Sequence, residues 1–153
     1  MNISPNITLK EATYSDTAIR KGINNLPSDD QLQNMVQLAE NIFEPLRKGL
    51  GNHTIRISSF FRCEELNSAI GGAKNSQHVL GQAMDIDNAN PSNREIFEYI
   101  KDNLLFDQLI MEFPDANMHP SWVHVSYTKI NNRKNILVSR KINQKTVYEN
   151  YHS

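Results

Sequence analysis

The sequence predicts an α+β fold, in which helices and single strands alternate before a run of strands ends the chain. Two patterns support this class. Apolar residues recur every three or four positions after residue 30, as on one face of a helix, and alternate with polar residues around residue 124, as in a half-buried strand. At 153 residues the chain is long enough to bury a core, so we expect one domain over residues 1–153.

The first elements expected are a long helix and a strand. Ser28, followed by two aspartates, is a good N-cap for an apolar stripe. The stripe consists of Leu32, Met35, Val36, Ala39, Ile42, Phe43 and Leu46. Pro45 is expected to kink or end this helix, and Gly49 and Gly51 to stop it before a strand at residues 54–58.

The remaining elements follow in order. A short helix is expected near residues 64–70, a strand at 83–87 and a helix over 92–103, where Ser92 and Glu95 form a capping box. The end of the chain indicates antiparallel strands at 108–113 and 122–127, then a hairpin containing Ile136, Val138 and Val147. Residues from Tyr148 onward are expected to be a packed or frayed end.

Two separate segments carry residues suited to a metal. His78, Asp85 and His124 offer two imidazoles and a carboxylate, and a catalytic zinc takes about three such ligands with a fourth position open. Gly81 permits a turn that brings His78 and Asp85 together, while His124 alternates with valines as in a strand. Each residue alone is more often an ordinary buried or surface side chain. Their combination predicts one catalytic zinc ion.

The run S-x-H-x-x-G-x-A-x-D from Ser76 to Asp85 and the strand W-V-H-V-S from Trp122 to Ser126 resemble the M15 family of zinc D-Ala-D-Ala peptidases. These peptidoglycan-cleaving enzymes share a fold with the Hedgehog signalling domain. Further stretches resemble the branch common in phages and prophages, namely 8–20, 57–62, 65–67, 71–76 and 106–110, so the likeness covers roughly residues 7–128. It implies a small antiparallel sheet with helices packed on one side and zinc on the open face.

The resemblance implies hydrolysis of a peptide bond in the peptidoglycan stem, with zinc polarising the scissile carbonyl and activating water. Two residues compete as the base that takes the proton from this water. His119 lies five positions before His124, the spacing of the His-dependent members of the family, whereas Glu112 belongs to a motif similar to D-Q-L-I-x-E-F, and other branches use a carboxylate. The sequence leaves both open.

Two residues are expected to bind the substrate. Arg62 suits a carboxylate, because a guanidinium binds it through two hydrogen bonds, although an ion pair with Glu64, Glu65 or Glu112 is the alternative. Ser76 is expected to bond the substrate backbone or to stabilise its own turn. The bond cut stays open between release of terminal D-Ala and endopeptidase cleavage at L-Ala-D-Glu or in a cross-bridge.

Three side chains beside the expected site are assigned supporting roles. Asp87 is placed to orient a ligand imidazole, and Asp107 and Gln108 to support His78 or His124.

Composition excludes several other classes. The net charge of −1 gives no electrostatic case for nucleic acid or an anionic membrane, and no apolar run approaches a membrane span. Cys63 is the only cysteine, which excludes an internal disulfide and a CxxC zinc ribbon. We expect a monomer made in the cytoplasm, because no signal peptide is recognisable. It would reach the wall through a phage holin, on a virion, or with a leader missing from this sequence.

Two rival hypotheses use the same residues differently. A catalytically silent zinc-bearing module that binds peptidoglycan or protein would keep His78, Asp85 and His124 but would make no use of His119 or Glu112. A virion protein without metal would need none of them. The full ligand set beside two candidate bases favours the peptidase.

Overall fold

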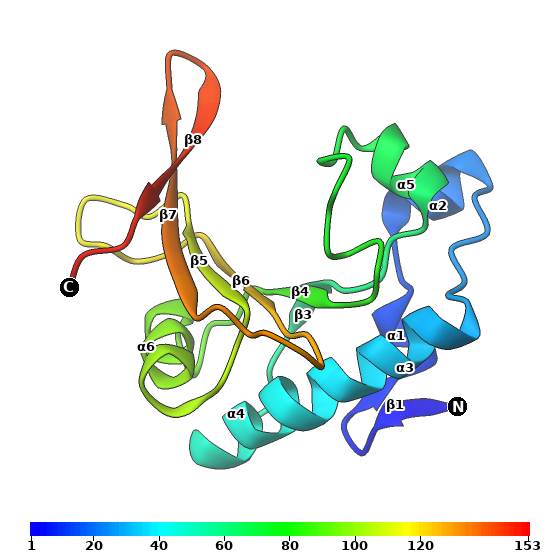
Figure 1. The fold of residues 1–153 in the computed structure, drawn as a ribbon, viewed down its shortest axis with the longest axis horizontal. Coiled ribbons are helices and arrows are strands. Elements are labelled where there is room, and N and C mark those ends of the chain that lie inside the picture. The colour runs from blue at the N-terminus through cyan, green and yellow to red at the C-terminus, as the bar shows by residue number, and fades with distance from the viewer.

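The computed structural model describes residues 1–153 and contains a six-stranded sheet and a separate two-stranded sheet (Figure 1). The strands are β1 (Asn2–Ser4), β2 (Ile7–Thr8), β3 (Ile57–Ser59), β4 (Ala83–Ile86), β5 (Gln108–Glu112), β6 (Trp122–Ser126), β7 (Asn135–Ile142) and β8 (Lys145–Asn150). The helices are α1 (Leu9–Ala12), α2 (Asp16–Lys21), α3 (Asp29–Leu38), the π-helical turn η1 (Ala39–Phe43), α4 (Glu44–Gly49), α5 (Glu64–Ala69) and α6 (Asn93–Asn103). None of these helices has both the length and the apolar character needed to cross a membrane.

The helix that begins after Ser28 runs as one rod through α3, η1 and α4 (Figure 1). The N-cap expected at Ser28 is present and forms a capping box, because the Ser28 side chain accepts from the Gln31 amide and the Gln31 side chain accepts from the Ser28 amide. The expectation that Pro45 ends or kinks the helix needs correction. Pro45 lies in the first turn of α4, directly after the π-helical turn, whose wider hydrogen-bond register tolerates the missing amide proton.

The large sheet has the strand order β3-β4-β6-β5-β7-β8, and all its pairs are antiparallel except β5 with β7. The sequence analysis expected only antiparallel strands, so this parallel pair is a correction. Its cause is the connection over residues 127–134, which passes across the start of β5 instead of turning back beside β6. The Asn135 amide already bonds to the Asp107 carbonyl, which brings β7 in at the end where β5 begins.

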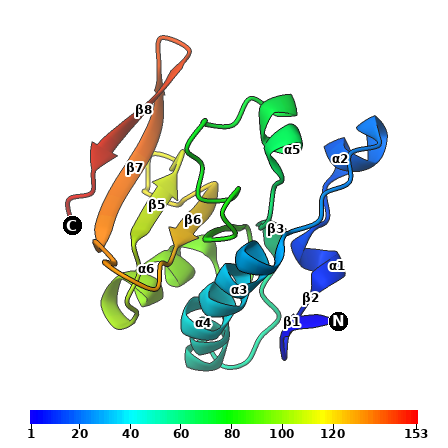
Figure 2. The same cartoon turned by 45° about the vertical axis from the view of Figure 1, so that its right-hand side comes forward.

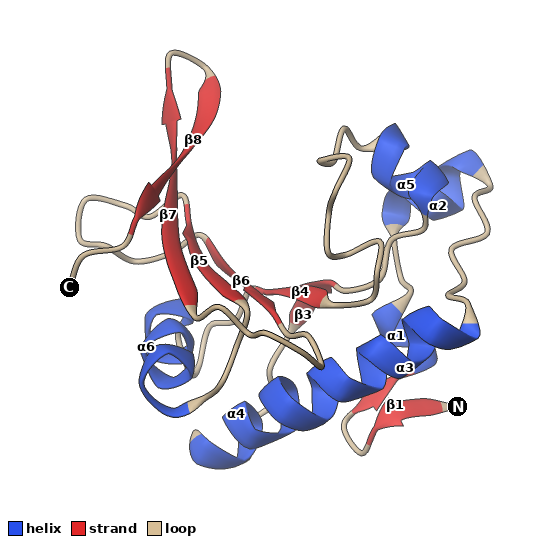
Figure 3. Ribbon diagram, viewed as in Figure 1, coloured by secondary structure: helices blue, strands red, loops and turns tan.

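The two faces of the sheet differ in character. Strand residues such as Met84, Val123, Val125 and Met111 belong to a core of 23 buried residues that also takes in side chains of α3, η1, α4 and α6. These helices cover one face (Figure 3). Successive residues of a strand face opposite sides, so the residues between the core positions point to the other, open face. The expected α+β class, with helices packed on one side of a small, mainly antiparallel sheet, is confirmed.

The open face lies between two projecting parts of the molecule. Figures 1 and 2 both show the β7–β8 hairpin rising at one end of the sheet and α5 standing beyond β3 at the other. Both parts belong to segments that line the cavity described below.

Candidate metal centre

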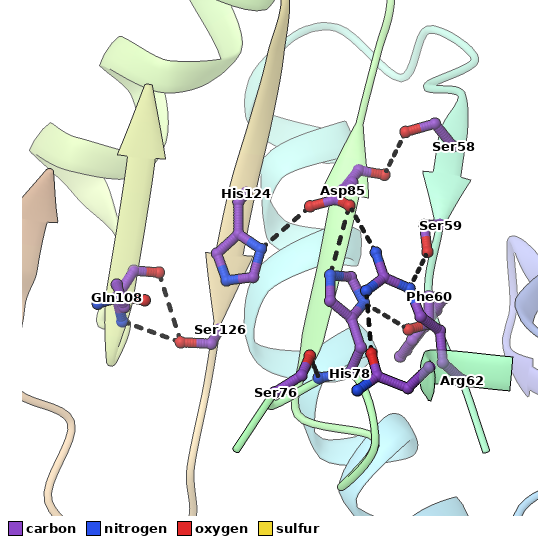
Figure 4. A network of polar contacts seen from close by, with 11 residues as sticks. Ser58, Ser59, Phe60, Arg62, Ser76, His78, Asp85, Gln108, His124 and Ser126 are labelled. Atoms are coloured by element: carbon purple, nitrogen blue, oxygen red, sulfur yellow. Dashed lines mark hydrogen bonds and ion pairs between the residues drawn. The ribbon is translucent and has the colours of Figure 1, made fainter. Parts of the chain in front are cut away.

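One row of side chains crosses the open face of the sheet. Asp85 on β4 pairs with His124 on β6, and His124 pairs with Ile110 on β5. Ile110 pairs in turn with Leu137 on β7. Because paired residues of adjacent strands project to the same face, the acid and the imidazole meet above the sheet, as Figure 4 shows.

His78 reaches the same point from the loop before β4. Its ring Nδ1 lies 2.7 Å from the Phe60 carbonyl oxygen, which fixes the ring from behind. The loop rests on α3, where the Gln31 side chain donates to the Val79 carbonyl. Gly81 makes this close approach possible, because its φ is +73° and a Cβ there would lie 2.5 Å from the Gln31 carbonyl oxygen. The turn expected at Gly81 is therefore present.

The three candidate ligands converge closely. His78 Nε2 lies 3.3 Å from one oxygen of the Asp85 carboxylate, and His124 Nδ1 lies 3.0 Å from the other. One ligand atom from each of the three residues falls within 4.8 Å of the others. This spacing is compatible with three donors around a single ion.

The hydrogen bonding of His78 also fits a metal. A carbonyl oxygen accepts only from a protonated nitrogen, so the bond to Phe60 places the proton on Nδ1 and leaves the lone pair of Nε2 directed at Asp85. Metal-binding histidines are typically oriented in this way, through a carbonyl or carboxylate on the far nitrogen. Asp87, expected to orient a ligand, instead bonds to Arg56 and Asn93, because it lies just past the end of β4.

The protonation states suit binding too. Burial lowers the pKa of His78, so the ring is neutral at neutral pH. Burial alone would raise the pKa of Asp85, but the two histidines beside it lower that pKa well below its usual range. A neutral imidazole beside an ionised carboxylate is the state that a metal ion requires of such ligands.

The three residues lie in a cavity of about 710 Å³. Other candidate residues from the sequence line the same cavity, namely Arg62, Ser76, Gln108 and Glu112. Ser76 also accepts a hydrogen bond from the His78 amide at 3.2 Å, so it stabilises the turn that carries the ligand.

Glu112 is the side chain of the cavity that has a buried oxygen without a hydrogen-bond partner. It is 8% exposed, and its Oε1 is the only buried side-chain nitrogen or oxygen in the protein without a partner. Burial raises the pKa of Glu112, and the negative charge of Asp85 adds to this effect. An unpaired carboxylate oxygen beside the candidate ligands is free to accept a proton from a water molecule held there.

The other candidate base, His119, lies elsewhere. It is exposed in the loop between β5 and β6, it does not line the cavity, and its backbone is held by Asp115 through bonds in both directions. The five-residue spacing between His119 and His124 therefore does not bring His119 to the cavity. The structure brings Glu112 to the ligands and leaves His119 outside.

Arg62 stands on the β3 side of the ligands and is largely buried, with 17% of its side chain exposed. The expected alternative, a pair with a nearby glutamate, is wrong in its partner: Arg62 Nη2 faces Asp85 at 3.5 Å. Ser59 and Asn67 hold the same guanidinium at 3.3 and 3.5 Å. These contacts are long for charged hydrogen bonds, so the group can turn toward an incoming anion at modest cost.

A model of the peptidase M15 family matches residues 5–126 of the chain. The chain belongs to the peptidase M15 family. No curated protein sequence matches it. The matched span contains the candidate ligands together with Arg62, Ser76 and Glu112, so the resemblance inferred from the motifs is confirmed at the level of the family.

The cavity of this M15 peptidase also includes residues that lie beyond the matched span. Arg133, Leu137 and Tyr148 all line it, and none was identified as a site residue from the sequence. Tyr148 was expected in a packed or frayed end, yet it lies within β8 opposite Ser139 on β7. The sequence carries no clear signal for this face, because Ile136, Leu137 and Val138 are consecutive apolar residues without alternation.

Asp107 and Gln108, which were expected to support His78 or His124, form no hydrogen bond with these ligands through their side chains. Asp107 contacts neither His78 nor His124, and its carboxylate instead binds Arg133 and Gln77. The reason is that Asp107 precedes β5 and its side chain turns toward the loop that leads into β7. Gln108 lines the cavity and its backbone bonds to Ser126, but no hydrogen bond joins its side chain to a ligand.

Proposed function

We propose that this M15 peptidase uses one zinc ion to hydrolyse a peptide bond in the stem peptide of peptidoglycan. The observation that carries the proposal is the convergence, within one cavity, of three metal donors and the unpaired Oε1 of Glu112. Membership of a zinc-dependent peptidase family supports both the ion and the reaction class. The likeness to phage enzymes further suggests release by a holin or carriage on a virion.

The ion would be held by His78 Nε2, by the Asp85 carboxylate and by His124 Nδ1, the nitrogen that faces the acid. When bound, it would polarise the scissile carbonyl and bring the pKa of a water molecule toward neutrality. The Phe60 carbonyl would keep the His78 ring in its binding tautomer throughout. The protein's own contribution to this step is thus a rigid and correctly protonated donor set.

Glu112 would act as the general base. Its Oε1 would accept the proton of the attacking water and then deliver it to the departing amine, as a carboxyl group with a raised pKa is suited to do. Arg62 would hold a substrate carboxylate through two hydrogen bonds, and Ser76 would align the peptide backbone. The silent binding module gives no role to the unpaired oxygen of Glu112, which favours the enzyme.

The test is hydrolysis of purified muropeptides, with fragments identified by mass spectrometry. We expect cutting by the wild type, loss of cutting after EDTA treatment, and recovery with zinc. Glu112→Gln should lower kcat by about 100- to 10,000-fold, the usual contribution of a general base. His119→Ala is the matched control, because it removes the other candidate base, which lies outside the cavity, and it should leave kcat unchanged. Zinc-loaded, folded protein that binds muropeptides without cutting them would favour the binding module instead.

A further inference from the structure

A second arginine reaches the cavity from outside the span matched by the family. Arg133 lies in the loop between β6 and β7, and its side chain is 59% exposed. The Asp107 carboxylate accepts from Arg133 Nε at 2.9 Å and from Nη2 at 2.8 Å. The Arg133 backbone amide donates to the same acid at 3.1 Å. A flexible, exposed side chain is thereby held in one orientation.

The acid that holds Arg133 is itself fixed. Asp107 is 3% exposed, and Gln77 donates to its second oxygen at 2.9 Å. Gln77 immediately precedes His78, so this network joins the loop that carries a candidate ligand to the loop that carries Arg133. Hydrogen bonds from Arg133 and Gln77 lower the pKa of Asp107 to about 2, so the acid is ionised at neutral pH.

Arg133 and Arg62 approach the cavity from opposite sides. Arg62 follows β3 and Arg133 precedes β7, and these strands are separated by β4, β6 and β5 in the sheet. Strands lie about 4.8 Å apart, so the two backbones are separated by roughly 19 Å measured along the sheet, with Asp85 on β4 and His124 on β6 between them.

Arg133 retains a free donor for a ligand. Asp107 engages Nε and Nη2, while Nη1 has no hydrogen-bond partner in the protein. A guanidinium already held in place loses little conformational entropy on binding an anion, which favours recognition over a mobile lysine. Arg62 and Arg133 thus offer two separate cationic positions to one bound chain.

We propose that Arg133 binds a second substrate carboxylate, on the opposite side of the metal ligands from the carboxylate held by Arg62. The inference rests on the proposed function and narrows it to stem peptides that carry carboxylates on both sides of the scissile bond. Two groups of the stem have this chemistry: the α-carboxylate of D-glutamate and the side-chain carboxylate of diaminopimelate. The alternative is that Arg133 and Asp107 only tie the loop to β5.

Matched substrates separate these two sources. Stem peptides are compared with D-glutamate against D-isoglutamine, and with diaminopimelate against lysine, so that each pair differs in one carboxylate. Each is measured as KM and kcat with the wild type, Arg133→Gln and Arg133→Lys, and as a Kd in a Glu112→Gln background. Arg140→Gln serves as the control, because Arg140 also lies in the C-terminal segment and pairs with Glu149 but does not line the cavity.

We expect Arg133→Gln to raise KM and Kd about tenfold for the peptide that carries the recognised carboxylate, because a hydrogen bond to a charged group is lost. The amide or lysine counterpart should be unaffected, kcat should hold, and Arg133→Lys should restore part of the difference. The proposal would be overturned if the wild type and Arg133→Gln showed the same ratio of KM and of Kd between the two peptides of each pair. Carboxylate-dependent binding through Arg133 without any cutting would keep this site and reject the peptidase.

Discussion

The Asp85 carboxylate is the residue on which the centre depends. One of its oxygens faces Arg62 and the other faces His124, so each oxygen has a neighbouring donor before any ion arrives. Glu112 is its opposite, since it is nearly as buried but keeps one oxygen without a partner. A carboxylate held by neighbouring donors, such as Asp85, is suited to bind a metal ion. A carboxylate with an unpaired oxygen, such as Glu112, is suited to accept a proton, so the two carboxyl groups of the cavity take different roles.

The raised pKa of Glu112 predicts how stability depends on pH in the metal-free protein. The folded state holds the Glu112 proton more tightly than the unfolded state, so its contribution is complete below the unfolded pKa of about 4.5 and is lost as pH rises through the folded value. Glu112→Gln should therefore melt a few degrees higher than wild type at pH 7. The gap should close below pH 4.

Thermal melts across this pH range, without metal, check the expectation. Glu40→Gln is the control, because Glu40 is exposed and removes a similar charge from the surface. A gap at pH 7 that persists unchanged at pH 4, or that appears equally for Glu40→Gln, would contradict the account.

Zinc should stabilise the folded protein through the same residues. An ion at 1,000 times its Kd adds about 4 kcal/mol when only the folded state binds it. We expect zinc to raise the melting temperature of wild type and of His119→Ala, while His124→Ala should lose most of the shift. Differential scanning calorimetry with and without zinc measures this. Equal shifts in wild type and His124→Ala would place the ion elsewhere.

At the scale of elements, the sequence predicted correctly those features that depend on residues close together in the chain. The N-cap expected at Ser28 and the capping box expected at Ser92 are both present, because a cap involves residues only three positions apart. The direction in which distant strands pair was predicted less accurately. Nothing near residues 135–142 encodes that β7 runs parallel to β5, since this depends on how the loop before it crosses the sheet.

The loop that carries His78 offers a test at this scale. Gly81→Ala would force a Cβ to within 2.5 Å of the Gln31 carbonyl oxygen of α3, in addition to the cost of a positive φ. We expect a loss of about 1–3 kcal/mol in the free energy of unfolding and weaker zinc binding, because the loop must move with its ligand.

Chemical denaturation and zinc titration measure the two effects of this change. Gly22→Ala is the matched control: its φ is +65°, but no atom lies within 4 Å of the added Cβ. It should cost about 1 kcal/mol and leave zinc affinity as it was. Equal losses of zinc affinity in both variants would show that the contact with α3 is unimportant.

At the scale of the whole molecule, the site is assembled from the middle and the C-terminal part of the chain. The ligands and Arg62 were identified from the sequence because they form compact motifs, whereas Arg133, Leu137 and Tyr148 were not. These three reach the cavity only through the β5–β7–β8 register, which sequence patterns do not specify. Their position opposite α5 makes the C-terminal segment one wall of the cavity (Figures 1 and 2).

Tyr148 tests whether that wall contacts substrate. It stands in the same cross-strand row as Ser139, Glu112 and Trp122, and 55% of it is exposed at the cavity. Tyr148→Ala should raise KM roughly fivefold with little change in kcat, because an aromatic contact is worth about 0.5–1.5 kcal/mol. Steady-state kinetics on muropeptides measure this. Val147→Ala, on the other face of β8, should change neither, and an equal effect there would point to the hairpin's stability.

The contact between the His78 loop and α3 has one more consequence. The Cβ that glycine lacks at position 81 would also lie 2.8 Å from Met35, a fully buried side chain of the core. The loop that carries His78 therefore packs directly on the hydrophobic core. Any repacking around Met35 should shift His78 relative to Asp85 and His124, which lie on the sheet. The affinity of this protein for zinc should serve as a gauge of how well its interior is packed, far from any residue that touches the ion.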